Sequence, residues 1–157
     1  MNTVLTQELG RYNRLLKEIK STSEALLKAI KGELVMTNDL DKMFKALYDG
    51  KVPDLWLAKS YPTLKPLANY VIDLQKRCNF FKNWVDNGIP KSFWLSGFFF
   101  TQSFLTGVLQ NYSRREKIPV DELTFSFLFK KTEIKEATSG TLVYGLFIEG
   151  ASWDAKR

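Results

Sequence analysis

The sequence predicts an α+β chain that is predominantly α-helical, in which a helical part is followed by the start of a β region. Three observations lead to this fold class. Apolar residues recur at alternating spacings of four and three along two long segments, which is typical of helices that pack on one face. Glycine and proline residues separate those segments from their neighbours. Beyond Pro119 the apolar period changes to two, which is typical of β-strands.

Size and composition fit a globular domain. A length of 157 residues allows one domain, or one domain with part of another, and the hydrophobic share of 45% is ordinary for globular proteins. The single cysteine cannot form an internal disulfide, and no secretory signal opens the sequence. We therefore expect a soluble, intracellular chain. Polar and glycine residues interrupt the most apolar stretch, residues 93–108, so no membrane partner is expected.

The first long helix is predicted over residues 3–31, with Gly32 at its C-terminal end. Its apolar positions have heptad spacing and are Leu5, Leu9, Tyr12, Leu16, Ile19, Ser23, Leu26 and Ile30. A shorter helix follows, with Thr37 or Asn38 as its N-cap and Asp49-Gly50 at its end. Its apolar face consists of Leu40, Met43, Phe44, Leu47 and Tyr48.

Residues 51–66 form a connector with three prolines and a single helical turn around Trp56. The second long helix is predicted from Pro66 to about residue 86, with the seam Leu67, Val71, Leu74, Cys78, Phe81 and Val85. Because the two seams match, we expect the long helices to pack on each other through Leu9, Leu16 and Leu26. An intermolecular coiled coil is the alternative, although neither seam is long enough for a stable zipper.

An aromatic segment, residues 92–111, contains no ionisable side chain. Aromatic side chains bury large apolar areas, so this composition indicates a packing surface rather than a reaction site. The segment ends in a predicted helix over residues 101–115. Arg114 and Arg115 in its last turn complement the helix dipole, an interpretation that we prefer to ligand binding.

Alternating apolar residues predict a strand through Leu123, Phe125, Phe127 and Phe129. A second apolar run follows at residues 142–148, so we predict that the two segments form a hairpin of an incomplete sheet. The predicted division is a helical part over residues 1–123 and a β part over residues 124–157.

Motifs for catalysis are absent from the sequence. It has no histidine, no GxxxxGK[ST] phosphate loop, and none of GxGxxG, HExxH, CxxC or GxSxG. The carboxylate pairs Asp39–Asp41 and Asp121–Glu122 stand at helix-start or turn positions that favour acids anyway. We therefore expect a non-enzymatic protein with no catalytic, metal-binding or cofactor-binding residues.

The net charge of +6 is the one compositional hint of an anionic partner. Most basic residues stand beside acidic ones, as in Lys17-Glu18 and Arg115-Glu116, whereas a nucleic-acid-binding face would cluster them. We favour a solvated surface of mixed charge. A nucleic-acid-binding domain rests on net charge alone, and no nucleic acid is expected as a partner.

Several blocks of the sequence closely resemble the C-terminal region of dynein heavy chains. They are WLAKSYPTLKPLANYVIDL, FWLSGFFFTQSFLTGVLQNYSRREKIPVDELTFSF and GLFIEGASWD, together with YNRLL near the start. The block TQSFLTGVLQNYSRREKIPVD is similar to the axonemal branch. The resemblance covers nearly the whole sequence.

The resemblance implies a piece of a giant motor subunit, in which a helical part precedes a β-barrel that is truncated here. It implies that ATP and Mg²⁺ are bound elsewhere in the parent subunit. The implied partners are the AAA+ ring of the same heavy chain, the other subunits of the dynein complex and, through the parent motor, microtubules. The implied localisation is the cytoplasm and cytoskeleton, in the axoneme of a cilium or flagellum.

The function predicted from all of this is a non-catalytic regulatory and packing segment of an axonemal dynein heavy chain. The alternative is a free-standing helical adaptor that pairs through its first helix. A surplus of aromatic residues suggests an interface, and the candidates are Trp56, Tyr61, Trp94, Phe98, Phe99, Phe100 and Trp153. That these side chains fill the local core instead is the competing interpretation.

Overall fold

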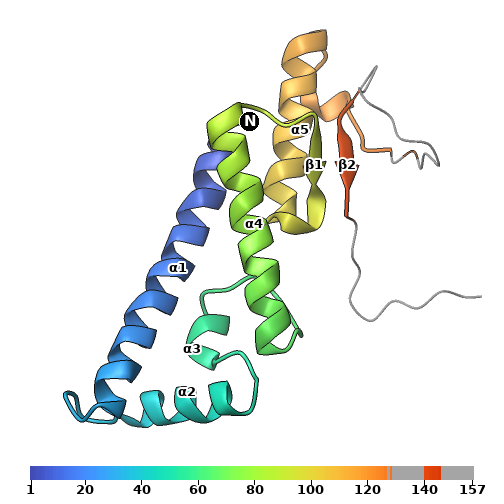
Figure 1. The fold of residues 1–157 in the computed structure, drawn as a ribbon. Coiled ribbons are helices and arrows are strands. Elements are labelled where there is room, and N and C mark those ends of the chain that lie inside the picture. The colour runs from blue at the N-terminus through green and yellow to red at the C-terminus, as the bar shows by residue number, and fades with distance from the viewer. Residues whose placement is uncertain (127, 129–139, 146–157) are drawn as a thin grey trace, which may run out of the picture. The chain divides into compact units, whose positions relative to one another are not determined.

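The computed structural model describes residues 1–126, 128 and 140–145. Along the sequence follow α1 (Asn2–Ile30), α2 (Asn38–Tyr48), α3 (Asp54–Leu57), α4 (Leu67–Asn87), β1 (Ser92–Trp94), η1 (Leu95–Gly97), α5 (Thr101–Glu116), η2 (Val120–Glu122) and β2 (Leu142–Tyr144) (Figure 1). The elements η1 and η2 are short 3₁₀ helices. The predicted fold class, α+β and predominantly α, is confirmed, and the sheet seen in the described residues is an open pair of strands.

The protein divides into two compact units. The helical unit comprises residues 2–86, and the sheet unit comprises Met1 with the described residues from 87 onward. The division predicted between residues 123 and 124 stays a prediction.

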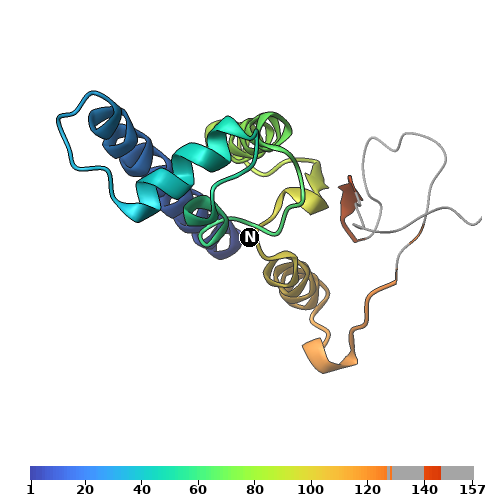
Figure 2. The ribbon, with the colours of Figure 1, turned by 90° about the horizontal axis from the view of Figure 1, so that it is seen from below.

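In the helical unit, α1 and α4 run side by side in opposite directions (Figures 1 and 2). The helix α2 leads away from the C-terminal end of α1, and α3 with the following connector lies between the two long helices. The rings of Tyr12 on α1 and Phe81 on α4 lie 5.2 Å apart, centroid to centroid. The prediction that the long helices pack on each other is therefore confirmed.

The helix boundaries follow local signals in the sequence. Gly32 has a φ of +77° and ends α1, since glycine takes this left-handed conformation without strain. Thr37 is the N-cap of α2, and its hydroxyl oxygen accepts a hydrogen bond from the Leu40 N–H at 3.3 Å. Pro53 precedes α3, where its fixed φ suits a helix start.

The buried face of α1 is rotated from the predicted seam. Its buried residues are Val4, Glu8, Tyr12, Leu15, Leu26 and Ala29. Leu16 was expected in the core but is 40% exposed, while its neighbour Leu15 is fully buried. The prediction for Leu16 was wrong because the buried face includes the polar residue Glu8, which a count of apolar positions passes over.

The same rotation occurs on α4. Its buried residues are Tyr70, Asp73, Leu74, Arg77, Phe81 and Trp84. The seam residues Val71 and Val85 are exposed instead, whereas Leu74 and Phe81 lie in the core as predicted. Here too the core face carries charged residues, because Asp73 and Arg77 neutralise each other there.

In the sheet unit, β1 pairs with β2 in parallel, with Ser92 opposite Leu142 and Trp94 opposite Tyr144. The predicted hairpin of residues 123–129 with 142–148 is thus wrong for its described part. Residues 123–126 and 128 form no strand, and residues 127, 129 and 146–148 lie outside the described residues. Alternation of side chains shows which face a strand buries but not which strand it pairs with, so β1 could not be foreseen as the partner.

Aromatic rings form the core of the sheet unit. Phe93 and Phe98 both pack against Phe104 of α5, at centroid distances of 4.9 and 4.5 Å. The helix α5 begins at Thr101 as predicted. It ends before Lys117, which has a left-handed φ of 57°.

Candidate functional site

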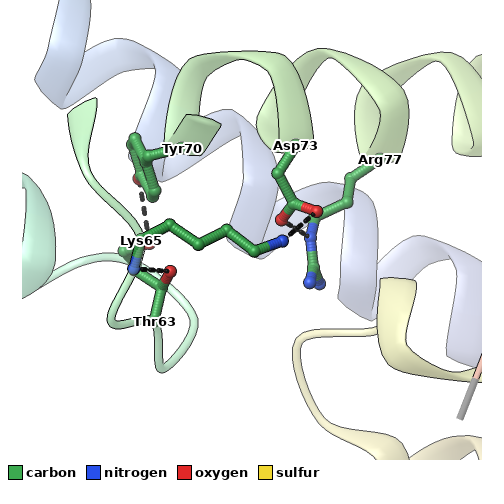
Figure 3. A network of polar contacts seen from close by, with 6 residues as sticks. Thr63, Lys65, Tyr70, Asp73 and Arg77 are labelled. Carbon is green, nitrogen blue, oxygen red and sulfur yellow. Dashed lines mark hydrogen bonds and ion pairs between the residues drawn. The ribbon is translucent and has the colours of Figure 1, made fainter. Parts of the chain in front are cut away.

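A cluster of three ionised side chains lies inside the helical unit (Figure 3). Asp73 accepts hydrogen bonds from Lys65 Nζ and from Arg77 Nε, both at 2.7 Å. Asp73 and Arg77 stand one turn apart on α4, and Lys65 comes from the connector before that helix. We call these three residues the ion cluster. It ties the connector to α4, because one carboxylate binds cations from both.

The pKa of Asp73 lies below the ordinary value of an aspartate. Burial alone would raise it, but the hydrogen bonds from Lys65 and Arg77 and the charge of Arg77 outweigh burial. Burial likewise disfavours the charged form of Arg77, yet its interactions with Tyr12 and Asp73 raise its pKa. The shifts of Asp73 and Arg77 both favour the charged form of the pair.

Tyrosine rings surround Arg77. The guanidinium carbon lies 3.8 Å from the centroid of the Tyr61 ring, a cation–π arrangement. Tyr61 stacks on Tyr70 at 5.7 Å and also contacts Tyr12 on α1 at 6.3 Å. The rings thus link α1, the connector and α4. Burial raises the pKa of Tyr12, Tyr61 and Tyr70, so all three stay neutral near pH 7.

Two further hydrogen bonds hold the same parts together. The hydroxyl oxygens of Ser60 in the connector and Tyr70 on α4 lie 2.9 Å apart. Trp56 on α3 donates from Nε1 to the Thr22 hydroxyl on α1 at 3.0 Å. These two contacts therefore tie α3 to α1 and the connector to α4.

The ion cluster was not predicted from the sequence. The sequence pattern that could have revealed it is an aspartate and an arginine four residues apart within an otherwise apolar helix face. Residues four apart lie on the same side of a helix, where they can form an ion pair. Glu8 is a second case, because it is fully buried and pairs with Arg11 at 2.8 Å. Removing one partner of such a buried pair is costly, because the other charge is then left buried alone.

Two of the predicted interface residues lie inside the helical unit. Trp56 and Tyr61 are buried, and each has the intramolecular contacts described above. An interface role for these two residues stays a prediction. In this structure they contribute to the core.

The other predicted interface residues belong to the aromatic segment and the end of the sequence. Phe98 is buried against Phe104, Trp94 and Phe99 are half-buried, and Phe100 is 49% exposed. Trp94 packs close to two glycines, since a Cβ atom added at Gly97 or Gly145 would collide with its ring. Trp153 lies outside the described residues. Of the described candidates, Phe100 presents the largest exposed fraction to a partner.

The part of the protein that the structure describes offers neither a membrane-spanning helix nor a metal site. No helix there combines the length and the apolar character needed to cross a bilayer. No group of three or more Asp, Glu or Cys side chains gathers there as a metal site would require.

Comparison with protein families matches all residues from 1 to 157 to the family described as the C-terminal domain of the dynein heavy chain. The chain belongs to this family. The identification made from the sequence blocks is thereby confirmed. The two units described above are those of the C-terminal domain of a dynein heavy chain.

Curated relatives of this domain are axonemal dynein heavy chains. It is 52% identical to rat "Dynein axonemal heavy chain 1", over 98% of this chain and 4% of the relative. It is 50% identical to human "Dynein axonemal heavy chain 3", over 99% of this chain and 4% of the relative. Human "Dynein axonemal heavy chain 12" is 46% identical, over 98% and 5%. The domain thus spans about one twentieth of the length of these relatives.

Proposed function

We propose that this chain is the non-catalytic regulatory and packing segment at the C-terminal end of an axonemal dynein heavy chain, within an ATP-driven microtubule motor. The observation that carries the proposal is the match of the whole sequence to the family, with about half of its residues identical in axonemal relatives. Its localisation is the axoneme of a cilium or flagellum.

The polar and aromatic contacts of the helical unit support a packing role. The ion cluster and the tyrosine rings fix α1, the connector and α4 to one another. Charged groups that are buried and mutually satisfied specify one arrangement of the helices. A helical unit held in one arrangement in this way suits a segment that packs against the parent motor and regulates it.

The partners and cofactors of the proposal follow from the family. The domain contacts the AAA+ ring of its own heavy chain, and other dynein subunits and microtubules are partners of the parent motor. ATP and Mg²⁺ bind in other modules. In the adaptor alternative α1 would offer its seam to a separate protein, whereas Tyr12 of that seam packs on Tyr61 and Phe81 within this domain.

The proposal is tested with the parent heavy chain, with and without residues 1–157. We expect ATP hydrolysis to persist without them, while the microtubule gliding velocity or its coupling to hydrolysis changes. Loss of all ATP turnover on deletion, in a heavy chain that still assembles, would contradict a regulatory role. Calorimetric titration of the isolated domain with ATP and magnesium is the second test, and a saturable micromolar isotherm would contradict the non-catalytic assignment.

A further inference from the structure

Lysine and arginine side chains gather on the outer face of α1, which points away from the core of the helical unit. The inner face is marked by Tyr12 and Leu15, which are buried. Helical residues turn by about 100° each, and five exposed cations lie within about 70° of the direction opposite to these two residues. They are Arg14, Lys17, Lys20, Lys28 and Lys31, and we call them the basic stripe. Lys31 continues the helical pattern, since its N–H donates to the Leu27 carbonyl at 3.1 Å.

The acidic residues of α1 lie mostly on its other sides. Glu8 is fully buried and pairs with Arg11, and Glu18 is half-buried. Lys17 stands next to Glu18 in the sequence, but consecutive residues of a helix point in directions about 100° apart. Charges that alternate along the sequence are therefore separated around the helix.

One acid lies on the outer face of α1, a helix that the structure describes in full. The carboxylate of Glu24 is 4.0 Å from Lys20 Nζ, in an exposed pair. Within the described residues, no ion pair involves Arg14, Lys17 or Lys28. The basic stripe with Glu24 therefore carries a net charge of +4.

The spacing of these cations is unfavourable for the free helix. Three pairs stand three residues apart, namely Arg14 with Lys17, Lys17 with Lys20, and Lys28 with Lys31. Side chains at this spacing are neighbours on a helix, and like charges there repel each other. A partner of opposite charge would relieve the repulsion, so the helix itself favours binding of an anionic group.

The length and the side chains of the basic stripe favour an acidic peptide. Arg14 and Lys31 are about 25 Å apart along the helix axis, a distance that an extended peptide of about eight residues covers. Each exposed ion pair contributes little alone, so several carboxylates must act together. The residues between the cations on this face, such as Asn13 and Ser21, are small and polar. They offer neither aromatic rings for stacking on nucleic-acid bases nor apolar side chains for insertion into a membrane.

We propose that the basic stripe binds an acidic peptide segment of a separate protein, with carboxylates spread over about eight residues. A second copy of this protein is a poor source of that segment. Its acidic residues are scattered, and Asp121 and Glu122 are the only two that are adjacent. Its net charge of +6 also repels another copy. Such binding goes beyond the regulatory and packing function, because it would recruit a partner to the domain.

The test measures binding of a fluorescent polyglutamate peptide of about eight residues to the 157-residue protein by fluorescence anisotropy. Lys17→Glu combined with Lys28→Glu reverses two charges of the basic stripe. The matched control, Lys59→Glu combined with Lys76→Glu, changes the net charge equally at two exposed lysines outside α1. Circular dichroism verifies that both variants keep the helical fold. If the stripe variant does not, Lys17→Gln combined with Lys28→Gln replaces it, against Lys59→Gln combined with Lys76→Gln.

We expect the stripe variant to bind the peptide at least about fivefold more weakly than the native protein, and the control variant to bind within about twofold. Raising NaCl from about 0.05 M to about 0.3 M should weaken binding to the native protein, because salt screens exposed charges. The inference is overturned if the peptide does not bind. It is also overturned if both variants lose affinity equally, because net charge alone is then responsible.

Two further outcomes would assign the basic stripe to a different occupant, and either overturns the inference. A single-stranded oligonucleotide of equal charge that binds more tightly, with the same loss in the stripe variant, would make the partner a nucleic acid. A parent heavy chain that fails to bind the peptide, although the domain alone binds it, would show that the rest of the heavy chain covers the stripe. The proposed function is judged by the deletion experiment instead, so the two can fail independently.

Discussion

The guanidinium group of Arg77 lies over the ring of Tyr61, with its central carbon 3.8 Å from the ring centroid. Arg77 belongs to α4, and Tyr61 belongs to the connector that precedes it. The contact therefore fastens an irregular segment onto a regular helix. Because Arg77 also donates to Asp73, the cation has a ring on one side and a carboxylate on another, and little of it is left to hydration.

Replacing Asp73 with asparagine should destabilise the protein by about 3 kcal/mol, because it leaves Arg77 buried without a counter-charge. Urea unfolding followed by circular dichroism measures the change. The matched control is Asp86→Asn on the same helix, which breaks an exposed ion pair with Lys82 and should change the stability far less. Equal losses in the two variants would show that burial of the pair is not what matters.

The stability of the protein should depend on pH through Asp73. Its pKa in the folded state is below the ordinary value of 3.8, so its contribution is fully present above about pH 4. That contribution is lost as the pH falls through the folded-state pKa. The unfolding free energy of the native protein should therefore fall more steeply than that of Asp73→Asn between about pH 4 and about pH 2. Parallel curves would contradict the assignment.

The buried tyrosines should produce a second pH dependence at the alkaline end. Burial raises the pKa of Tyr12 above its ordinary value of 10, so the folded state favours the neutral ring. This contribution is fully present below about pH 10 and is lost as the pH rises towards the folded-state pKa. Tyr12→Phe should therefore lose less unfolding free energy than the native protein between about pH 9 and about pH 11, measured by urea titration.

Adjacent leucines on α1 should respond differently to truncation. Leu15 is fully buried, so Leu15→Ala should cost about 2–5 kcal/mol of unfolding free energy. Leu16 is 40% exposed, and Leu16→Ala should cost well under half as much. Thermal unfolding of the two variants at one concentration provides the comparison. A larger loss for Leu16→Ala would restore the seam predicted from heptad spacing.

Two glycine-to-alanine changes should have opposite signs. A Cβ atom at Gly97 would lie 2.8 Å from the Trp94 ring, so Gly97→Ala should overpack the site and cost about 1–3 kcal/mol. Gly10 stands inside α1, where no side chain or other segment lies within 4 Å of its would-be Cβ, and Gly10→Ala should stabilise the protein by about 0.5–1 kcal/mol. Differential scanning calorimetry of both variants tests the signs.

Helix positions were readable from the sequence because short-range signals determine them. Gly32, Thr37 and Pro53 act within one turn of the residues that they cap or end, and each marks the boundary that the structure has. The family could be identified for a similar reason, since its sequence blocks are continuous. Both depend on residues that are neighbours in the sequence.

The buried faces and the strand pairing were not readable in the same way. A prediction from apolar positions places the charged residues Asp73 and Arg77 on the surface, so it assigned Val71 and Val85 to the buried face of α4 instead. Their burial depends on Lys65 and on tyrosines from other elements, which periodicity does not contain. Likewise, the aromatic candidates Trp56 and Phe98 could not be divided between core and interface before their neighbours were known.

The parallel pairing of β1 with β2 has a consequence for the order of folding. Ser92 and Leu142 are about fifty residues apart, so their contact must close a long loop before it gains any stabilisation. The helices, by contrast, form from contacts within a few residues, on a timescale of about a microsecond or less. We expect the individual helices α1, α2 and α4 to form before the two strands meet. During synthesis the residues of the helical unit all emerge before β2 does, so β1 would remain without its partner strand while the helical unit can already fold.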